Sequence, residues 1–189
     1  MSSTSNLVPT GAVPAAANDE TLERAWSALE SVPDPEIPVV SIRELGILRG
    51  VERTEDGVLE VVITPTYSGC PAMAHIAEDI AHALDAAGLT PHRIKTVLAP
   101  AWTTDWITPP AREKLRAYGI APPGGRCAGT PAAGHEQAIR FVPRADSSPA
   151  CPRCGSAHTE RLSQFGSTAC KALYRCLDCR EPFDYFKPY

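Results

Sequence analysis

Apolar positions recur with a helical period in three stretches of the chain, alternate with polar positions in two others, and form one mostly apolar run. In chain order these predicted elements span residues 19–31, 47–53, 58–64, 71–87, 93–99 and 111–118. Asp56-Gly57 between the two alternating runs predicts a hairpin. The apolar character of the third strand predicts a central place in its sheet. We therefore expect an α/β fold, a small two-layer α-β-β-α-β-α domain with a three-stranded mixed sheet, over residues 19–120.

The segments outside this domain differ from it in composition. Residues 1–18, rich in Ser, Thr, Pro and Ala, predict a disordered tail, and residues 121–147 predict a Pro/Gly-rich linker before a last module at 148–189. A hydrophobic content of 43% and a net charge of −4 favour a globular protein with little attraction for nucleic acid. No stretch has the pattern of a signal peptide or a membrane span. We expect a cytoplasmic protein whose seven cysteines stay reduced.

The stretch from Thr64 to Met73 places a single thiol, Cys70, at the junction between the second strand and the second helix. Gly69 lets the backbone turn there, and Pro71 suits the first position of the helix. A cysteine that faces unpaired amides at a helix N-terminus is expected to have a lowered pKa, and its thiolate would bind a metal or attack an electrophile. The alternative is a buried cysteine that only packs as a small hydrophobe.

A second cysteine pattern lies in the last module, where two C-x2-C pairs are separated by twenty-one residues. Each pair forms a tight knuckle that directs two thiolates at one point, so the two pairs predict a tetrahedral all-sulfur site in a zinc-ribbon-like β module. A structural Zn(II) is the expected metal. An iron–sulfur cluster stays open, because spacing alone does not separate the metals. The four ligands are Cys151, Cys154, Cys176 and Cys179.

Two further cysteines stand outside these motifs. Cys170 is either a packing residue or a thiol used with a partner, and Lys171 beside it would lower its pKa if the thiol were exposed. Cys127 lies in the predicted linker, where we expect no role for it. Residues 182–189 carry more aromatic rings than a small ribbon can cover, so some of them are expected to pack on another surface.

Several polar residues are further candidates. Asp34 and Glu36 lie in a proline-rich loop, where they would serve as caps or as carboxylates beside the Cys70 loop. Asp105 lies between Trp102 and Trp106, whose rings predict either a core plug or the wall of an interface or pocket. A solvated helix face is the preferred interpretation of four polar residues at helical spacing, which are His75, Glu78, Asp79 and His82.

Taken together, these motifs resemble known families. In the first domain they are Asp34-Pro35-Glu36-Ile37-Pro38, Ser41-Ile42 with Leu45-Gly46, the run from Thr64 to Pro71 and the run from Pro100 to Trp106. This domain resembles the iron–sulfur-assembly family that includes SufT. Further motifs are Cys151-Pro152-x-Cys154-Gly155-Ser156, the run from Phe165 to Lys171, and the Cys176/Cys179 knuckle. With these, residues 20–120 and 148–189 are similar to the PaaD (or PaaJ) family, the D subunits of bacterial phenylacetyl-CoA epoxidase systems.

The resemblance implies an accessory or maturation subunit in aerobic phenylacetate catabolism, not the oxygenase itself. Cys70 would transiently hold iron or an iron–sulfur cluster, with a homodimer as one way to complete the shell, while Asp34, Glu36 and Asp105 would shape the site. The ribbon, with Cys170 at its surface, would dock the implied partners, the phenylacetyl-CoA oxygenase subunits and their 2Fe–2S flavin reductase. A structural adaptor subunit, and a thiol-dependent enzyme that uses Cys70 as nucleophile, stay open as alternatives.

Overall fold

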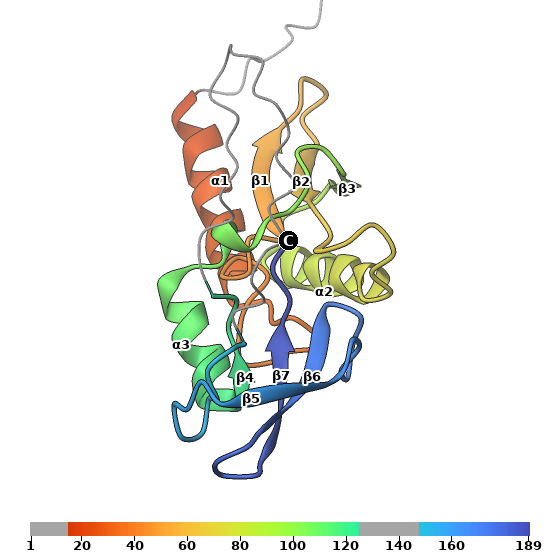
Figure 1. Cartoon of the computed structure of the whole chain (residues 1–189). Coiled ribbons are helices and arrows are strands. Elements are labelled where there is room, and N and C mark those ends of the chain that lie inside the picture. Colours follow the sequence, from red (N-terminus) through yellow and green to blue (C-terminus); the bar gives the residue numbers. More distant parts are fainter. Residues whose placement is uncertain (1–14, 125–147) are drawn as a thin grey trace, which may run out of the picture.

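The computed structural model describes residues 15–124 and 148–189, with the C-terminus in the middle of the molecule, between two sheets (Figure 1). In chain order the elements are α1 (Ala15–Glu30), β1 (Leu48–Arg53), β2 (Leu59–Ile63), α2 (Met73–Ala86), β3 (His92–Thr96), a 3-10 turn (Thr104–Trp106), α3 (Pro109–Tyr118), β4 (Ile120–Ala121), β5 (Thr159–Ser163), β6 (Lys171–Cys176) and β7 (Pro182–Phe186). The predicted α/β order is confirmed. None of the helices in these two ranges is long and apolar enough to cross a membrane.

The first sheet has the order β1-β2-β3, with β1 antiparallel and β3 parallel to β2. The mixed three-stranded sheet is therefore confirmed, but the prediction of a central third strand is wrong, because β2 lies in the middle and β3 at the edge. The side chains of β3 explain this position. Arg93 Nε and Lys95 Nζ both donate to the buried carboxylate of Glu60 on β2, at 2.7 and 3.1 Å. These long cations keep their ends near water, which an edge strand allows and a central strand does not.

The second sheet has the order β4-β7-β6-β5 and unites the two parts of the chain. The β5, β6 and β7 strands form an antiparallel ribbon, whereas the short β4 comes from the end of the first part and pairs parallel with β7. Its second residue, Ala121, pairs with Tyr185 and belongs to the segment predicted as linker. A two-residue strand has no detectable period, so the sequence did not indicate it.

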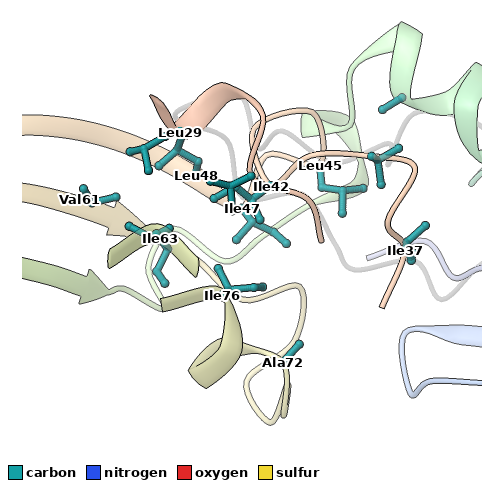
Figure 2. Packing of buried hydrophobic residues seen from close by; sticks show 14 of the residues in the cluster. Leu29, Ile37, Ile42, Leu45, Ile47, Leu48, Val61, Ile63, Ala72 and Ile76 are labelled. Carbon is teal, nitrogen blue, oxygen red and sulfur yellow. The ribbon is translucent and has the colours of Figure 1, made fainter. Parts of the chain in front are cut away.

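One hydrophobic core cluster extends from the first sheet into the ribbon. Figure 2 shows part of it, with Ile63 of β2 and Ile76 of α2 among the labelled residues. Cys170 and Phe186 of the C-terminal part belong to the same cluster. The ring of Trp102 packs against Phe186 at 5.8 Å between centroids. The prediction that the C-terminal aromatic residues pack on another surface is thereby confirmed, and the ribbon is held on the first part by apolar contact as well as by β4.

Candidate functional site

The four predicted cysteine ligands meet at the end of the ribbon. Their sulfur atoms all lie within 4.8 Å of one another, with 3.7 Å between Cys151 and Cys179 and 3.6 Å between Cys154 and Cys176. A regular tetrahedron with metal–sulfur bonds of 2.3 Å has edges of about 3.8 Å, so the donor set fits a tetrahedral divalent metal such as Zn(II). The backbone N–H of Cys179 helps to lower the pKa of Cys176 to about 7, which favours the thiolate that a metal needs.

Cys70 lies in the turn between β2 and α2, half-buried against the core cluster, and its backbone N–H donates to Tyr67 O at 3.1 Å. Helix α2 begins at Met73, so Pro71 is not its first residue. Burial raises the pKa of the Cys70 thiol, and a hydrogen bond from the backbone of Ala72 opposes the rise. The predicted lowering of this pKa is therefore wrong. Desolvation and the nearby carboxylates raise the pKa of Cys70 by more than the few amides that face the thiol lower it.

Asp34 caps its own loop, whereas Glu36 accepts no capping hydrogen bond that the structure shows among the described residues. The buried Asp34 accepts hydrogen bonds at Oδ1 from the backbone N–H groups of Glu36 and Ile37, at 2.9 and 2.8 Å, and so closes the loop. Both carboxylates also lie near enough to Cys70 to raise its pKa through their charge. Burial raises the pKa of Asp34 and of Glu36 in turn. Two carboxyl groups whose pKa values are raised by burial thus lie near a half-buried thiol.

Cys170 approaches the same place from the ribbon. The expectation that it lies at the ribbon surface is wrong, because its residue is only 4% exposed. Its Sγ lies 3.0 Å from Thr168 Oγ1, and burial raises its pKa. Lys171 lowers that pKa by its charge, but the effect is smaller than that of burial, and its own buried ammonium lies 3.7 Å from Asp184. Its burial favours the first of the two alternatives for Cys170, a packing residue.

Three residues near these thiols were not among the predicted site residues, although Tyr67 and Thr168 lie inside the quoted motifs. The phenol of Tyr67 interacts electrostatically with Cys70, and its pKa is raised by burial. Tyr189 does so with Cys170, and burial likewise raises its pKa. Thr168 Oγ1 lies 3.0 Å from Cys170 Sγ, and the Thr168 side chain lowers the pKa of Glu36 against the larger effect of burial. The one available signal was their position, since Tyr67 and Thr168 stand three and two residues before the two thiols.

Asp105 stands apart from this group. It is exposed in the 3-10 turn, where its backbone N–H donates to Thr103 Oγ1 at 3.4 Å, and it is not among the charges that perturb Cys70. Its role stays a prediction. Trp102 is buried as a core plug, with its indole N–H donating to Leu45 O at 2.9 Å, while Trp106 is half-buried.

The remaining candidates form no second site of four ligands. In residues 15–124 and 148–189, only the four ribbon cysteines come together as three or more close metal-ligating groups. The predicted solvated helix face is half-buried or exposed in α2, and its residues are His75, Glu78, Asp79 and His82. Cys127 lies outside the described residues.

Comparison with known proteins accounts for both parts of the chain. Residues 22–91 match the model of the "Iron-sulfur cluster assembly protein" family, and residues 136–187 match the "PaaD zinc beta ribbon domain". The chain is 51% identical over 162 residues to a protein of Escherichia coli (strain K12) that is named as the D subunit of a putative 1,2-phenylacetyl-CoA epoxidase, and the match covers 86% of this chain and 90% of that protein. The chain belongs to the PaaD family.

Other relatives cover about half of this PaaD-family chain. A protein named "Fe-S protein maturation auxiliary factor YitW" of Bacillus subtilis (strain 168) is 36% identical over 84 residues, or 44% of this chain and 81% of that protein. A solved structure described as "Domain of Unknown Function DUF59 from Bacillus anthracis" is 25% identical, with a TM-score of 0.49, over 54% of this chain and 97% of the other.

Proposed function

We propose that this protein is an accessory, maturation subunit of a bacterial phenylacetyl-CoA epoxidase complex in aerobic phenylacetate degradation. In the cytosol it assists the delivery of iron or iron–sulfur clusters to the oxygenase subunits and to their 2Fe–2S flavin reductase. The observation that carries the proposal is the 51% identity to the D subunit of a putative epoxidase over both parts of the chain. The match of residues 22–91 to an iron–sulfur cluster assembly family supports the maturation role.

The two cysteine sites have different tasks in this proposal. The four-cysteine set has the closed geometry of a structural site, and a Zn(II) ion there would supply folding energy to a module with little core of its own. Its core cluster holds only six buried residues, which are Ala121, Cys151, Ala172, Tyr174, Cys176 and Phe183. Cys70, by contrast, is half-buried in a loop beside two carboxylates, so it can take up and release an iron cargo.

A structural adaptor remains the second candidate, because one feature favours it. The ribbon and α3 enclose a hollow of about 540 Å³ that includes Phe165 and Tyr118, which are 61% and 53% exposed. Exposed aromatic rings at the edge of a hollow are typical of a protein-docking surface. The thiol-enzyme alternative has less support, because the raised pKa of Cys70 leaves little thiolate at neutral pH and no histidine is among the groups that perturb it.

The test uses cells that produce the complete epoxidase system with wild-type protein, Cys70→Ser or, as a control thiol, Cys127→Ser. We expect Cys70→Ser to lower both phenylacetyl-CoA epoxidation and the iron and acid-labile sulfide of the purified oxygenase and reductase subunits, while Cys127→Ser matches the wild type. Unchanged activity and cluster content in Cys70→Ser would refute the maturation role. Co-purification that persists in that variant with full activity would favour the adaptor.

A further inference from the structure

We infer that the hollow between α3 and the ribbon is a docking site for an arginine side chain, which a partner protein presents between apolar residues. This inference deepens the proposed function and rests on it for the identity of the partner, an oxygenase or reductase subunit. It concerns how this chain holds that subunit, and neither the four-cysteine set nor the thiol of Cys70 takes part in it.

The hollow lies on the face of the second sheet that is turned away from the small core of the ribbon. Leu173 stands on β6 between Ala172 and Tyr174, which belong to that core, so its side chain points to the opposite face. Its register partner Asp184 on β7 lies on the same face, and both line the hollow of about 540 Å³. The short β4 joins α3 to the edge of this sheet (Figure 1), and Tyr118 at the end of α3 forms one side of the hollow. The volume is within the roughly 300–1,000 Å³ of ligand pockets, so a side chain with parts of its neighbours has room there.

The charged side chains of the hollow do not balance. Three of them line it, which are Lys171, Asp184 and Glu36. The buried ammonium of Lys171 lies 3.7 Å from a carboxylate oxygen of Asp184, so these two charges compensate each other. Glu36 is half-buried, and no basic side chain in residues 15–124 and 148–189 forms an ion pair with it. One carboxylate is left over, so charge complementarity favours a cationic occupant.

Two exposed aromatic rings at the hollow, those of Phe165 and Tyr118, favour arginine over lysine as this cation. The ring of Phe165 already binds a cation of this chain, because Lys187 Nζ lies 4.6 Å from its centroid. A guanidinium group is planar and more weakly hydrated than an ammonium group, so it stacks on an aromatic ring while its N–H groups bond a carboxylate. Rings and a free carboxylate in one hollow therefore match arginine.

The apolar lining of the hollow explains why the arginine should have apolar neighbours. Pro182 is exposed and Leu173 is half-buried, and both lie beside the rings of Phe165 and Tyr118 in the same lining. Exposed apolar surface of this kind, bordered by polar groups, is typical of an interaction site. Its burial would supply affinity, while the carboxylate of Glu36 would fix the position of the incoming segment.

The experiment replaces Tyr118 of the full chain with the photo-crosslinking aromatic residue benzoylphenylalanine, in cells that produce the complete epoxidase system. The matched control places the same residue at Leu98, which is 60% exposed and does not line the hollow. After irradiation, peptide mass spectrometry identifies the crosslinked segment. We expect position 118, and not position 98, to crosslink a segment of an oxygenase or reductase subunit that contains an arginine between apolar residues.

A binding titration between the purified, zinc-loaded chain and that subunit tests the chemistry. Glu36→Gln should weaken binding about tenfold, and Phe165→Ala about fivefold, whereas Leu98→Ala should match the wild type. Replacement of the identified arginine by lysine should weaken binding, and its replacement by alanine should weaken it further. Retained zinc and an unchanged melting temperature show that each variant of this chain is folded.

A crosslinked segment without arginine would overturn the inference, and so would a crosslink to a second copy of this chain or to its own residues 125–147. Affinities of Glu36→Gln and Phe165→Ala equal to that of the wild type would also overturn it. If the subunits co-purify with the chain but position 118 forms no crosslink, the inference fails while the proposed function stands. Subunits that do not associate with the wild-type chain would overturn the inference, and the epoxidase assay of Cys70→Ser then judges the proposed function separately.

Discussion

Phe186 is the side chain that most directly tests whether the ribbon and the first part form one body. Its residue is 1% exposed, and although it ends β7 of the ribbon, it belongs to the core cluster of the first part. Truncation of a buried Phe to Ala costs about 3–5 kcal/mol. For a chain of this length that loss lowers the melting temperature by roughly 6–20 °C. Phe186→Ala should therefore leave a folded protein whose two parts are less firmly joined.

The assay is urea unfolding followed by two probes. All three tryptophans, Trp26, Trp102 and Trp106, lie in the first part, so their fluorescence reports its unfolding, while release of the ribbon metal reports the other part. We expect coincident transitions in the wild type and, in Phe186→Ala, metal release at a lower urea concentration than the fluorescence change. The matched control is Phe165→Ala, because Phe165 is 61% exposed. That change should cost less than about 1 kcal/mol. If Phe186→Ala lowers the free energy of unfolding no more than Phe165→Ala does, the reasoning is refuted.

Three further predictions follow from other features. Gly46→Ala should lower the free energy of unfolding by more than the roughly 1–2 kcal/mol that a left-handed backbone costs an alanine, because the φ of Gly46 is +74° and an added Cβ would lie 2.6 Å from Trp106 Cβ. The control is Gly57→Ala, where φ is +81° and a Cβ meets open space. Equal unfolding free energies of the two variants would contradict this prediction. Chelation of the ribbon metal should increase amide hydrogen exchange in β5–β7 and not in β1–β3, so protection that persists in β5–β7 would be contrary evidence. The rate of Cys70 alkylation in iron-free protein, followed by peptide mass spectrometry, should rise with a midpoint above pH 9.0, because burial raises the pKa of Cys70. A midpoint near neutral pH would be inconsistent with that raised pKa.

Much of the fold could be predicted because its signals are local. The hairpin at Asp56-Gly57, the knuckles of the ribbon and the helix closed by Gly119 each depend on a few neighbouring residues. Strand order is different, because it depends on which side chains meet across the sheet. The apolar residues after Thr96 suggested a central third strand, whereas the contacts of Arg93 with Glu60 place β3 at the edge.

The candidate site was only half predictable for the same reason. Cys70, Asp34 and Glu36 could be selected from their motifs, but Cys170 could not be placed beside them, because its position depends on how the ribbon docks. The pKa of Cys70 was misjudged because the sequence indicates the helix that follows the thiol and not the burial and carboxylates around it. A local sequence pattern, however specific, does not report properties that depend on long-range packing.

The strand β6 has a consequence for how this protein depends on metals. It begins at Lys171, directly after Cys170, and ends at Cys176, a ligand of the four-cysteine set. Six residues of extended chain measure roughly 17–20 Å, so one stiff segment connects the four-cysteine set to Cys170 in the core cluster. A shortage of the structural metal would loosen one end of this segment and weaken the core packing of Cys170 at the other. In the cell, such a shortage would disturb the junction between the ribbon and the first part, although Cys170 and Phe186, which pack at that junction, are not ligands of the metal.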